Sequence, residues 1–269
     1  MGKIYILGDI HGKFHPVRDL INTVKDIDTI ILLGDAGLNY YLDGRDCTTK
    51  KKINRYKVNI FVIRGNHEQR PSICMKNHPD DWRKETFWGN KVYVEKAYPH
   101  IKYALDYPAK YEIPTAQGEP LKTLVLPGAY SVDKYFRIEN NLKWFKHEQC
   151  TSEEMGFGIR LAHSNTWDLV LSHTCPIIYE PTDLFLRTVD QSLVDKTTER
   201  WLGAVEYDLD YRLWCWGHYH ALRVYPKYQN KEKIMLFNDY ALDLYKYFFC
   251  NNVNIYDCLI NIQEEKNNA

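Results

Sequence analysis

Three short apolar segments near the start of the chain each end close to a glycine and a polar residue. Residues 3–7 precede Gly8-Asp9, residues 29–33 precede Gly34-Asp35, and residues 59–63 precede Arg64-Gly65-Asn66. Runs of this length, rich in β-branched and aliphatic residues, are typical of buried strands. After the first run, Pro16 and the apolar residues that follow it at helical spacing predict a helix. The pattern predicts alternating strands and helices, and so an α/β sheet.

The rest of the chain predicts further strands and one more helix. Strands are expected over residues 92–94, 101–105, 121–126, 169–171, 213–216 and 234–237, because short β-prone runs there alternate with proline and glycine turns. Residues 190–205 carry apolar residues at helical spacing and predict a helix. We expect these strands to form a second sheet that packs on the first.

Composition sets outer limits on what this protein can be. Its 269 residues suit one domain, expected over residues 1–262 with a polar tail at 263–269. Lysine and arginine together equal aspartate and glutamate, at 35 each, which excludes a general attraction to nucleic acid, membranes or acidic partners. Seven scattered cysteines and no apolar run of membrane-spanning length favour a reduced, cytoplasmic protein that does not enter membranes.

Five separate motifs carry residue types that bind metals. They are Gly8-Asp9-Ile10-His11, Gly34-Asp35, Gly65-Asn66-His67-Glu68, Ser172-His173 and Gly217-His218-Tyr219-His220. Each follows a predicted strand, and open α/β sheets gather their ligand sites at the carboxyl ends of strands. We therefore expect these side chains to converge. Carboxylate, amide and imidazole ligands without thiolate suit Mn²⁺, Fe or Zn²⁺ alike.

In order and chemistry, the motifs from Gly8 to His220 resemble those of the calcineurin-like metallophosphoesterase superfamily. The resemblance implies an α/β (α+β) fold, a four-layer sandwich in which two mixed β-sheets lie face to face with helices outside. It also implies that Asp35 bridges two divalent metal ions, Mn²⁺ being favoured. The first metal would be held by Asp9, His11 and His220, and the second by Asn66, His173 and His218.

The same resemblance implies a reaction. A hydroxide that bridges the two metals would attack a phosphate ester in line, without a covalent intermediate. His67, with Asp35 a predicted catalytic residue, would contact the phosphoryl group or protonate the leaving oxygen, which an imidazole can do near neutral pH.

The substrate can be a phosphomonoester or a phosphodiester. Protein Ser/Thr phosphatases of this superfamily follow the second motif with Asp-Arg-Gly, but here Asp35 is followed by Ala36 and Gly37. The Gly-His-x-His motif instead resembles the phosphodiesterase and nuclease branches, which act on nucleotides or nucleic acid. The alternatives are therefore a phosphodiesterase or nuclease, a protein phosphatase, and a non-catalytic binding module on the same fold. No protein partner can be inferred.

Candidate substrate contacts lie near the motifs in sequence: Tyr40, Arg64, Ser131, Lys134 and Arg137. A basic run, Lys50 to Lys52 with Arg55 and Lys57, is expected on a helix. It can form a solvated face, or it can line the cleft and favour a polyanionic substrate such as nucleic acid.

Overall fold

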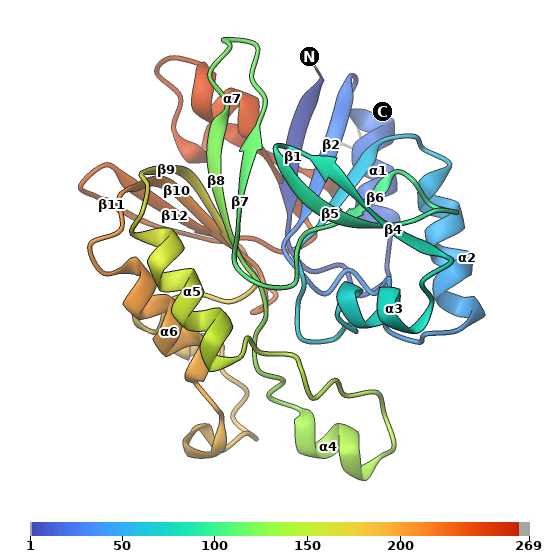
Figure 1. The fold of residues 1–269 in the computed structure, drawn as a ribbon. Coiled ribbons are helices and arrows are strands. Elements are labelled where there is room, and N and C mark those ends of the chain that lie inside the picture. Colours follow the sequence, from blue (N-terminus) through green and yellow to red (C-terminus); the bar gives the residue numbers. More distant parts are fainter. Residues whose placement is uncertain (1, 264–269) are drawn as a thin grey trace.

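A computed structural model describes residues 2–263, which form two mixed sheets that pack against each other (Figure 1). The first sheet has the strand order β14-β13-β1-β2-β3-β6-β5-β4. Its strands are β1 (Lys3–Leu7), β2 (Ile27–Leu32), β3 (Asn59–Val62), β4 (Trp82–Phe87), β5 (Asn90–Glu95), β6 (Ile101–Tyr103), β13 (Tyr240–Asp243) and β14 (Leu259–Asn261). Strands β1, β2, β3 and β6 are parallel, and the outer strands are antiparallel.

The second sheet has the order β11-β12-β10-β9-β8-β7. Its strands are β7 (Ala109–Ile113), β8 (Leu121–Leu126), β9 (Trp167–Ser172), β10 (Tyr211–Trp216), β11 (Arg223–Tyr228) and β12 (Lys231–Met235). Strands β8, β9, β10 and β12 are parallel, so their carboxyl ends meet at one edge. Both sheets thus have a parallel centre with antiparallel edges.

Most helices flank the outer faces of the sheets, and one projects beyond the strand ends (Figure 1). They are α1 (His15–Thr23), α2 (Gly44–Asn54), α3 (Pro71–Asn77), α4 (Lys134–Glu139), α5 (Ser152–Ala162), α6 (Thr197–Glu206) and α7 (Leu244–Phe249). Short 3₁₀ turns are η1 (Ile177–Tyr179), η2 (Thr182–Leu184), η3 (Gln191–Leu193) and η4 (Ile255–Cys258). The predicted fold class, two mixed sheets with helices outside, is confirmed.

The core lies between the two sheets. Buried side chains of the first sheet, such as Ile31 and Phe61, belong to one apolar cluster with Leu171 and Leu213 of the second sheet. A smaller cluster, which includes Trp201 of α6, fills the outer side of the second sheet. Burial of this apolar surface fixes how the sheets face each other, and so where their strand ends meet.

The predicted helix over residues 190–205 is wrong in its first half. The α-helix α6 begins only at Thr197, and residues 191–193 form the separate turn η3. Two aspartates explain the break. The Asp190 carboxylate accepts a hydrogen bond from the Ser192 backbone N–H, and the Asp195 carboxylate accepts one from the Thr197 N–H. Such local bonds compete with helix formation.

Among residues 2–263 there is no helix long and apolar enough to cross a membrane. The single domain expected over residues 1–262 stays a prediction. Apart from Gln263, the tail predicted over residues 263–269 lies outside the described residues.

Candidate metal centre

The five motifs converge at the carboxyl ends of strands from both sheets. The ends of β1, β2 and β3 carry Asp9 with His11, Asp35, and Asn66 with His67. The ends of β9 and β10 carry His173, and His218 with His220. Because the two sheets place their parallel strand ends together, residues more than 200 positions apart, such as Asp9 and His218, become neighbours.

Asp9, His11 and His220 form the first group of possible ligands. Their ligand atoms all lie within 4.8 Å of one another. His220 Nε2 lies 3.5 Å from Asp9 Oδ2, and His11 Nε2 lies 3.8 Å from the same oxygen. The two imidazole Nε2 atoms are 2.8 Å apart. Asp9 Oδ2 is buried and has no hydrogen-bond partner among the described residues, as expected for an oxygen that would bind a cation.

Asp35 stands between this group and a second one. Asp9, Asp35 and His173 satisfy the same 4.8 Å limit. Asp35 Oδ2 lies 3.6 Å from His173 Nε2 and 4.0 Å from His11 Nδ1, so one carboxylate oxygen faces both groups. Asn66 Oδ1 lies 2.8 Å from His173 Nε2, which brings the amide into the second group.

His218 completes the surroundings of the second group. Its ring centroid lies 5.0 Å from that of His173, and its backbone N–H donates to Asp9 Oδ1 over 2.8 Å. The His67 backbone N–H likewise donates to Asp35 Oδ1 over 2.9 Å. Each carboxylate therefore has one oxygen held by the main chain and the other directed at imidazole nitrogens. Such bonds orient ligands before a metal binds.

The glycines of the motifs are required by this convergence. A Cβ atom on Gly65 would lie 2.1 Å from Asp35 Oδ1, and one on Gly217 would lie 2.1 Å from Asp9 Oδ1. A Cβ on Gly34 would lie 2.2 Å from His173 Nδ1. Since real Cβ atoms stay at least 3.0 Å from such neighbours, each glycine leaves space for a ligand that arrives from another strand.

The electrostatics of the centre suit a cation. Burial penalises the charged forms of Asp9 and Asp35, but the neighbouring imidazoles, His173 foremost, together outweigh this and lower the pKa of both carboxyl groups. Burial likewise opposes the charge on His173, yet the Asp35 and Asp9 carboxylates raise its pKa to about 9. A proton on His173 thus balances two buried carboxylates, a role that metal ions fill when ligands are deprotonated.

Burial and the nearby His173 lower the pKa of His218 to about 3, so this imidazole is neutral, as a metal ligand must be.

His67 lies beside the expected ligands and faces open space. Its Nε2 is 3.8 Å from Asp35 Oδ2, and its ring centroid is 5.7 Å from that of His11. Burial is the largest influence on this imidazole and lowers its pKa. The residue lines a cavity of about 310 Å³ that also touches Asp35, His218 and His220. A phosphate ester bound there would therefore meet His67.

The predicted substrate contact Arg64 does not lie in this cavity. It is only 2% exposed, and its guanidinium donates to the backbone carbonyls of His147, Glu148 and Asp106. Through these bonds, Arg64 fastens the loop around residue 148 to the end of β3. We do not propose it again as a substrate contact.

Ser131 is also buried, and it positions a ligand instead of facing solvent. Its Oγ accepts a hydrogen bond from Asn66 Nδ2 over 3.0 Å and donates to Glu148 Oε2 over 2.5 Å. This contact turns the amide so that Asn66 Oδ1 points to His173. Glu148 therefore supports the centre from behind. No local sequence signal marks it, because it is distant from every motif.

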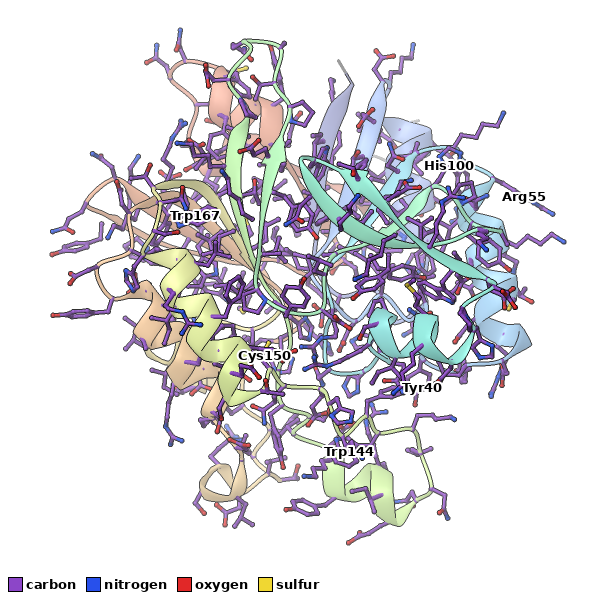
Figure 2. The ribbon with its side chains drawn as sticks, in the orientation of Figure 1. Tyr40, Arg55, His100, Trp144, Cys150 and Trp167 are labelled. Carbon is purple, nitrogen blue, oxygen red and sulfur yellow. The ribbon has the colours of Figure 1, made fainter. Side chains whose placement is uncertain are left out.

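Arg137, Tyr40 and Lys134 cluster around helix α4, which projects beyond the strand ends (Figure 1). Arg137 Nη1 donates to the Tyr40 hydroxyl over 3.1 Å, and Lys134 Nζ lies 4.6 Å from the centre of the Trp144 ring. Figure 2 shows Tyr40 and Trp144 on the side of the molecule from which α4 projects. The Arg137 charge also helps to lower the pKa of His67, after burial, so the cluster is close to the centre.

Glu68 is a further supporting residue. It is 4% exposed, and its Oε1 accepts a hydrogen bond from the Leu38 backbone N–H over 3.0 Å, so it holds the loop that follows Asp35. Burial, followed by the charge of Asp35, raises the pKa of Glu68 to about 7. The only sequence feature that pointed to Glu68 was its position in the third motif, two residues after Asn66.

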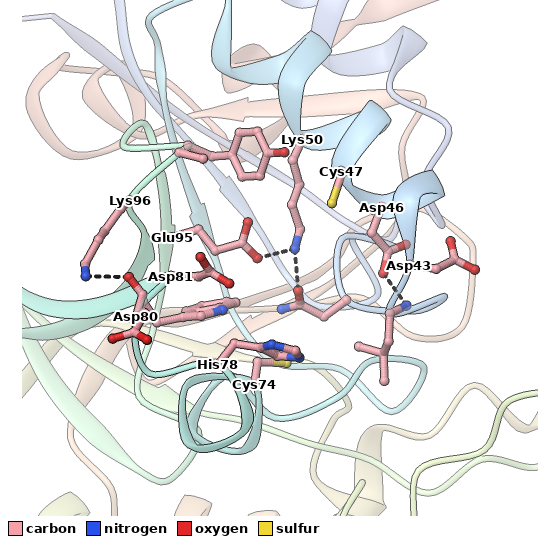
Figure 3. Close-up of a pocket in the computed structure, with 15 residues that line it drawn as sticks. Asp43, Asp46, Cys47, Lys50, Cys74, His78, Asp80, Asp81, Glu95 and Lys96 are labelled. Carbon is pink, nitrogen blue, oxygen red and sulfur yellow. Dashed lines mark hydrogen bonds and ion pairs between the residues drawn. The ribbon is translucent and has the colours of Figure 1, made fainter.

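The basic run lies on helix α2, but Lys50 does not face the metal centre. It borders a separate cavity of about 560 Å³ between α2, α3 and the β4–β5 hairpin (Figure 3). Lys50 is 4% exposed, and its Nζ donates to Glu95 Oε1 and to Asn39 Oδ1. Lys51 and Lys52 are exposed on the same helix. Lys51 and Lys52 therefore form a solvated face, whereas Lys50 forms an ion pair with Glu95 that is part of the structure.

Both the two-sheet fold and the acidic, imidazole-rich centre at the strand ends are those of a metallophosphoesterase. Residues 2–222 match the family model described as calcineurin-like phosphoesterase, so the chain belongs to that family. This confirms the resemblance seen in the motifs. No curated protein was found to match the sequence.

Several solved structures are similar to this chain at low sequence identity. The protein TT1561 of Thermus thermophilus is similar with a TM-score of 0.53 and 9% identity, covering 98% of this chain and 96% of that one. A dimetal phosphatase from Danio rerio has a TM-score of 0.49 and 10% identity, covering 90% and 95%. Phosphopantetheinyl hydrolase from Mycobacterium tuberculosis has a TM-score of 0.46 and 10% identity, covering 87% and 89%. At these identities, the likeness to TT1561 shows the fold alone.

Proposed function

We propose that this protein is a metal-dependent hydrolase of phosphate esters in which Asp35 is shared by two divalent cations. Asp9, His11 and His220 would hold one cation, and Asn66, His173 and His218 the other. The observation that carries the proposal is the pair of buried carboxylates, each with one oxygen held by a backbone N–H and the other facing imidazole nitrogens.

Two divalent cations bound there would activate water for in-line attack and neutralise charge on the phosphoryl group. The chain supplies the rest. Asp35 and Asp9 are held ready by the N–H groups of His67 and His218, and Ser131 turns Asn66 toward His173. His67, which faces the cavity and is no part of the two ligand groups, is the proposed donor of a proton to the leaving oxygen.

The set of ligand types favours Mn²⁺, Fe and Zn²⁺ equally, and Mn²⁺ is our first choice for assay. The test is Mn²⁺-dependent hydrolysis of a chromogenic phosphodiester and of the matching monoester, with Asp35→Asn protein as the blank. We expect metal-dependent turnover of at least one ester and none above background in the variant. Equal rates in wild type and Asp35→Asn would overturn the two-metal proposal.

A phosphodiesterase or nuclease acting on nucleotides or nucleic acid is the second candidate. The Gly217-His218-Tyr219-His220 motif favours it over a protein Ser/Thr phosphatase, because Ala36 and Gly37 stand where that branch carries the Asp-Arg-Gly arginine. Preference for the diester in the same assay would support this candidate. A binding module without activity is disfavoured because every expected ligand residue is present in the centre.

A further inference from the structure

The cavity beside the metal centre has a second wall that plays no part in metal binding. It is formed by residues 180–196, the segment of turns between β9 and α6, by Glu199 on α6, and by residues 130–133, just before α4. Figure 1 shows both segments at the end of the molecule where the central parallel strands finish. This wall would face the organic part of a phosphate ester whose phosphoryl group lies at the metals.

The wall combines apolar side chains with an excess of carboxylates. Leu184, Phe185, Leu186 and Val194 contribute apolar surface on one side. Outside the metal centre, the lining residues include four carboxylates, Asp133, Glu180, Asp195 and Glu199, against a single lysine, Lys196.

The hydrogen-bond and ion-pair partners of these charged side chains show which of them still lack a partner. Lys196 Nζ is already bound to Glu180 Oε1 at 2.6 Å and lies 4.5 Å from the centre of the Phe185 ring. The Asp195 carboxylate accepts from Thr197 and from Gln149 Nε2. Lys196, Glu180 and Asp195 therefore all have partners within the protein.

Glu199 differs from the other carboxylates. It lies on α6, is 3% exposed, and its Oε1 accepts from Thr174 Oγ1 over 2.9 Å. Its Oε2 is buried and has no hydrogen-bond partner among the described residues. The same holds for Asp133 Oδ1, whereas Asp133 Oδ2 accepts a hydrogen bond from Arg137 Nε. Leaving a buried acceptor unpaired is energetically unfavourable, so such atoms normally mark a missing partner.

We propose that the substrate is a small phosphate ester whose organic part carries a positively charged amine, and that Glu199 binds this amine. The inference rests on the proposed function. It follows from two acceptor oxygens without donors, from the lack of an uncompensated cation among the described residues of the wall, and from the apolar surface that would pack on the rest of the organic group.

Thr174 ties this site to the metal centre. It follows the expected ligand His173 and contacts Glu199, and its Oγ1 lies 3.1 Å from the hydroxyl of Tyr219, which stands between His218 and His220. The amine site and the metal site therefore share one rigid support. An amine held by Glu199 would fix the distance between its own nitrogen and the scissile phosphate, which gives selectivity for length as well as charge.

The test uses three phenyl phosphates that differ only in the para substituent: 2-aminoethyl, 2-hydroxyethyl or propyl. Each is prepared as the monoester or the methyl diester, whichever the enzyme hydrolyses faster with Mn²⁺, and phosphate or phenol release is measured. We expect kcat/KM for the amine to exceed that for the propyl ester about tenfold, since hydrogen bonds to charged groups contribute about 1.5–3 kcal/mol.

Glu199→Gln keeps the shape of the side chain but replaces an acceptor by a donor. In this variant we expect the preference for the amine, measured as the ratio of kcat/KM for the amine ester to kcat/KM for the propyl ester within the same protein, to fall to about twofold or less. Glu153→Gln, on the exposed first turn of α5, is the matched control and should keep the full preference. Metal content and the thermal midpoint are measured for each variant.

Equal kcat/KM for the amine and propyl esters in wild-type protein overturns the inference even if Glu199→Gln does not fold. A full amine preference in Glu199→Gln overturns the role of Glu199. In both cases metal-dependent turnover of the propyl ester leaves the phosphoesterase proposal standing, whereas no turnover of any ester overturns both.

Discussion

Replacing Gly65 by alanine should damage the metal centre although no expected metal ligand is itself replaced. The added Cβ would lie 2.1 Å from Asp35 Oδ1 and 2.5 Å from the Asp35 backbone nitrogen. The first contact is about 0.9 Å shorter than the 3.0 Å at which real Cβ atoms stop, and the second involves backbone, so the end of β2 must move. Gly65 does not have a positive φ, so backbone strain does not add to this effect.

The size of the effect follows from what the movement breaks. Displacing the Asp35 carboxylate loses the hydrogen bond from the His67 N–H, which for a charged acceptor costs about 1.5–3 kcal/mol of unfolding free energy. The lower entropy of the unfolded alanine chain offsets about 0.4–1 kcal/mol of this. A shift approaching 1 Å in a catalytic group costs about 100-fold in rate. We therefore expect net destabilisation of roughly 1–2 kcal/mol, reduced metal content and about 100-fold lower kcat/KM.

The assay compares urea unfolding, metal content and Mn²⁺-dependent turnover in Gly65→Ala and Gly44→Ala. Gly44 begins α2, and a Cβ there meets no heavy atom within 4 Å, so this control should keep full turnover and gain up to about 1 kcal/mol of stability. Wild-type metal content and turnover in Gly65→Ala would refute the argument that the motif glycines make room for the ligands.

Three further changes test other parts of the account. His67→Ala should keep both metals but lose most of kcat, more so for esters with poor leaving groups; loss of metal instead would make His67 a ligand. Lys50→Ala leaves the partly buried Glu95 unpaired and should cost up to about 3 kcal/mol of stability, against less than about 0.5 for exposed Lys51→Ala, with KM unchanged in both. A raised KM for Lys50→Ala alone would place it in substrate binding. Burial raises the pKa of Glu199 from 4.5 to about 7. Between these two pH values the folded, metal-free protein keeps a proton on Glu199 that the unfolded chain has released. The free energy of unfolding should therefore fall by up to about 3 kcal/mol as the pH rises from about 4.5 to about 7. Urea unfolding at about pH 5 and about pH 7.5 should show this fall reduced in Glu199→Gln, and an identical fall in both proteins would contradict it.

Local sequence signals predicted several central strands well, but the strands predicted over residues 92–94 and 101–105 join the first sheet as β5 and β6 and not the second sheet. The predicted bounds of β1 and β8 match the structure, because each is a continuous buried run closed by a turn. The motif glycines were recognised by their position at strand ends. Their physical purpose, room for a ligand from another strand, became visible only once the strands were placed together.

Long-range pairing was beyond the reach of the sequence. Strand β13 enters the first sheet beside β1, antiparallel and more than 230 residues away along the chain, and nothing local specifies that neighbour. The same limit applies to buried polar residues. From the sequence, Lys50 was predicted to belong to a solvated basic run and Arg64 to contact phosphate. In the structure, Lys50 binds Glu95 and Arg64 binds the backbone carbonyl of Glu148, and neither contact can be predicted from local sequence.

The wall of the substrate cavity was missed for a related reason. Residues 180–196 have no periodic pattern and form short 3₁₀ turns between irregular stretches, so no element could be predicted there except the helix that begins too early. Their position is fixed by tertiary contacts such as the double hydrogen bond between Arg223 and Asp183. The proposed determinants of substrate selectivity thus lie in a part of the chain that the motifs do not cover.

Metal stoichiometry is the measurement that tests the central claim most directly. Wild-type protein and Asp35→Asn would be loaded with Mn²⁺, freed of excess metal and analysed by inductively coupled plasma mass spectrometry, with turnover measured on the same samples. The account predicts two metal ions per chain in active wild-type protein, and fewer, with no turnover, in the variant. Turnover at the wild-type rate in Asp35→Asn, or an active wild-type protein that retains no metal, would contradict it.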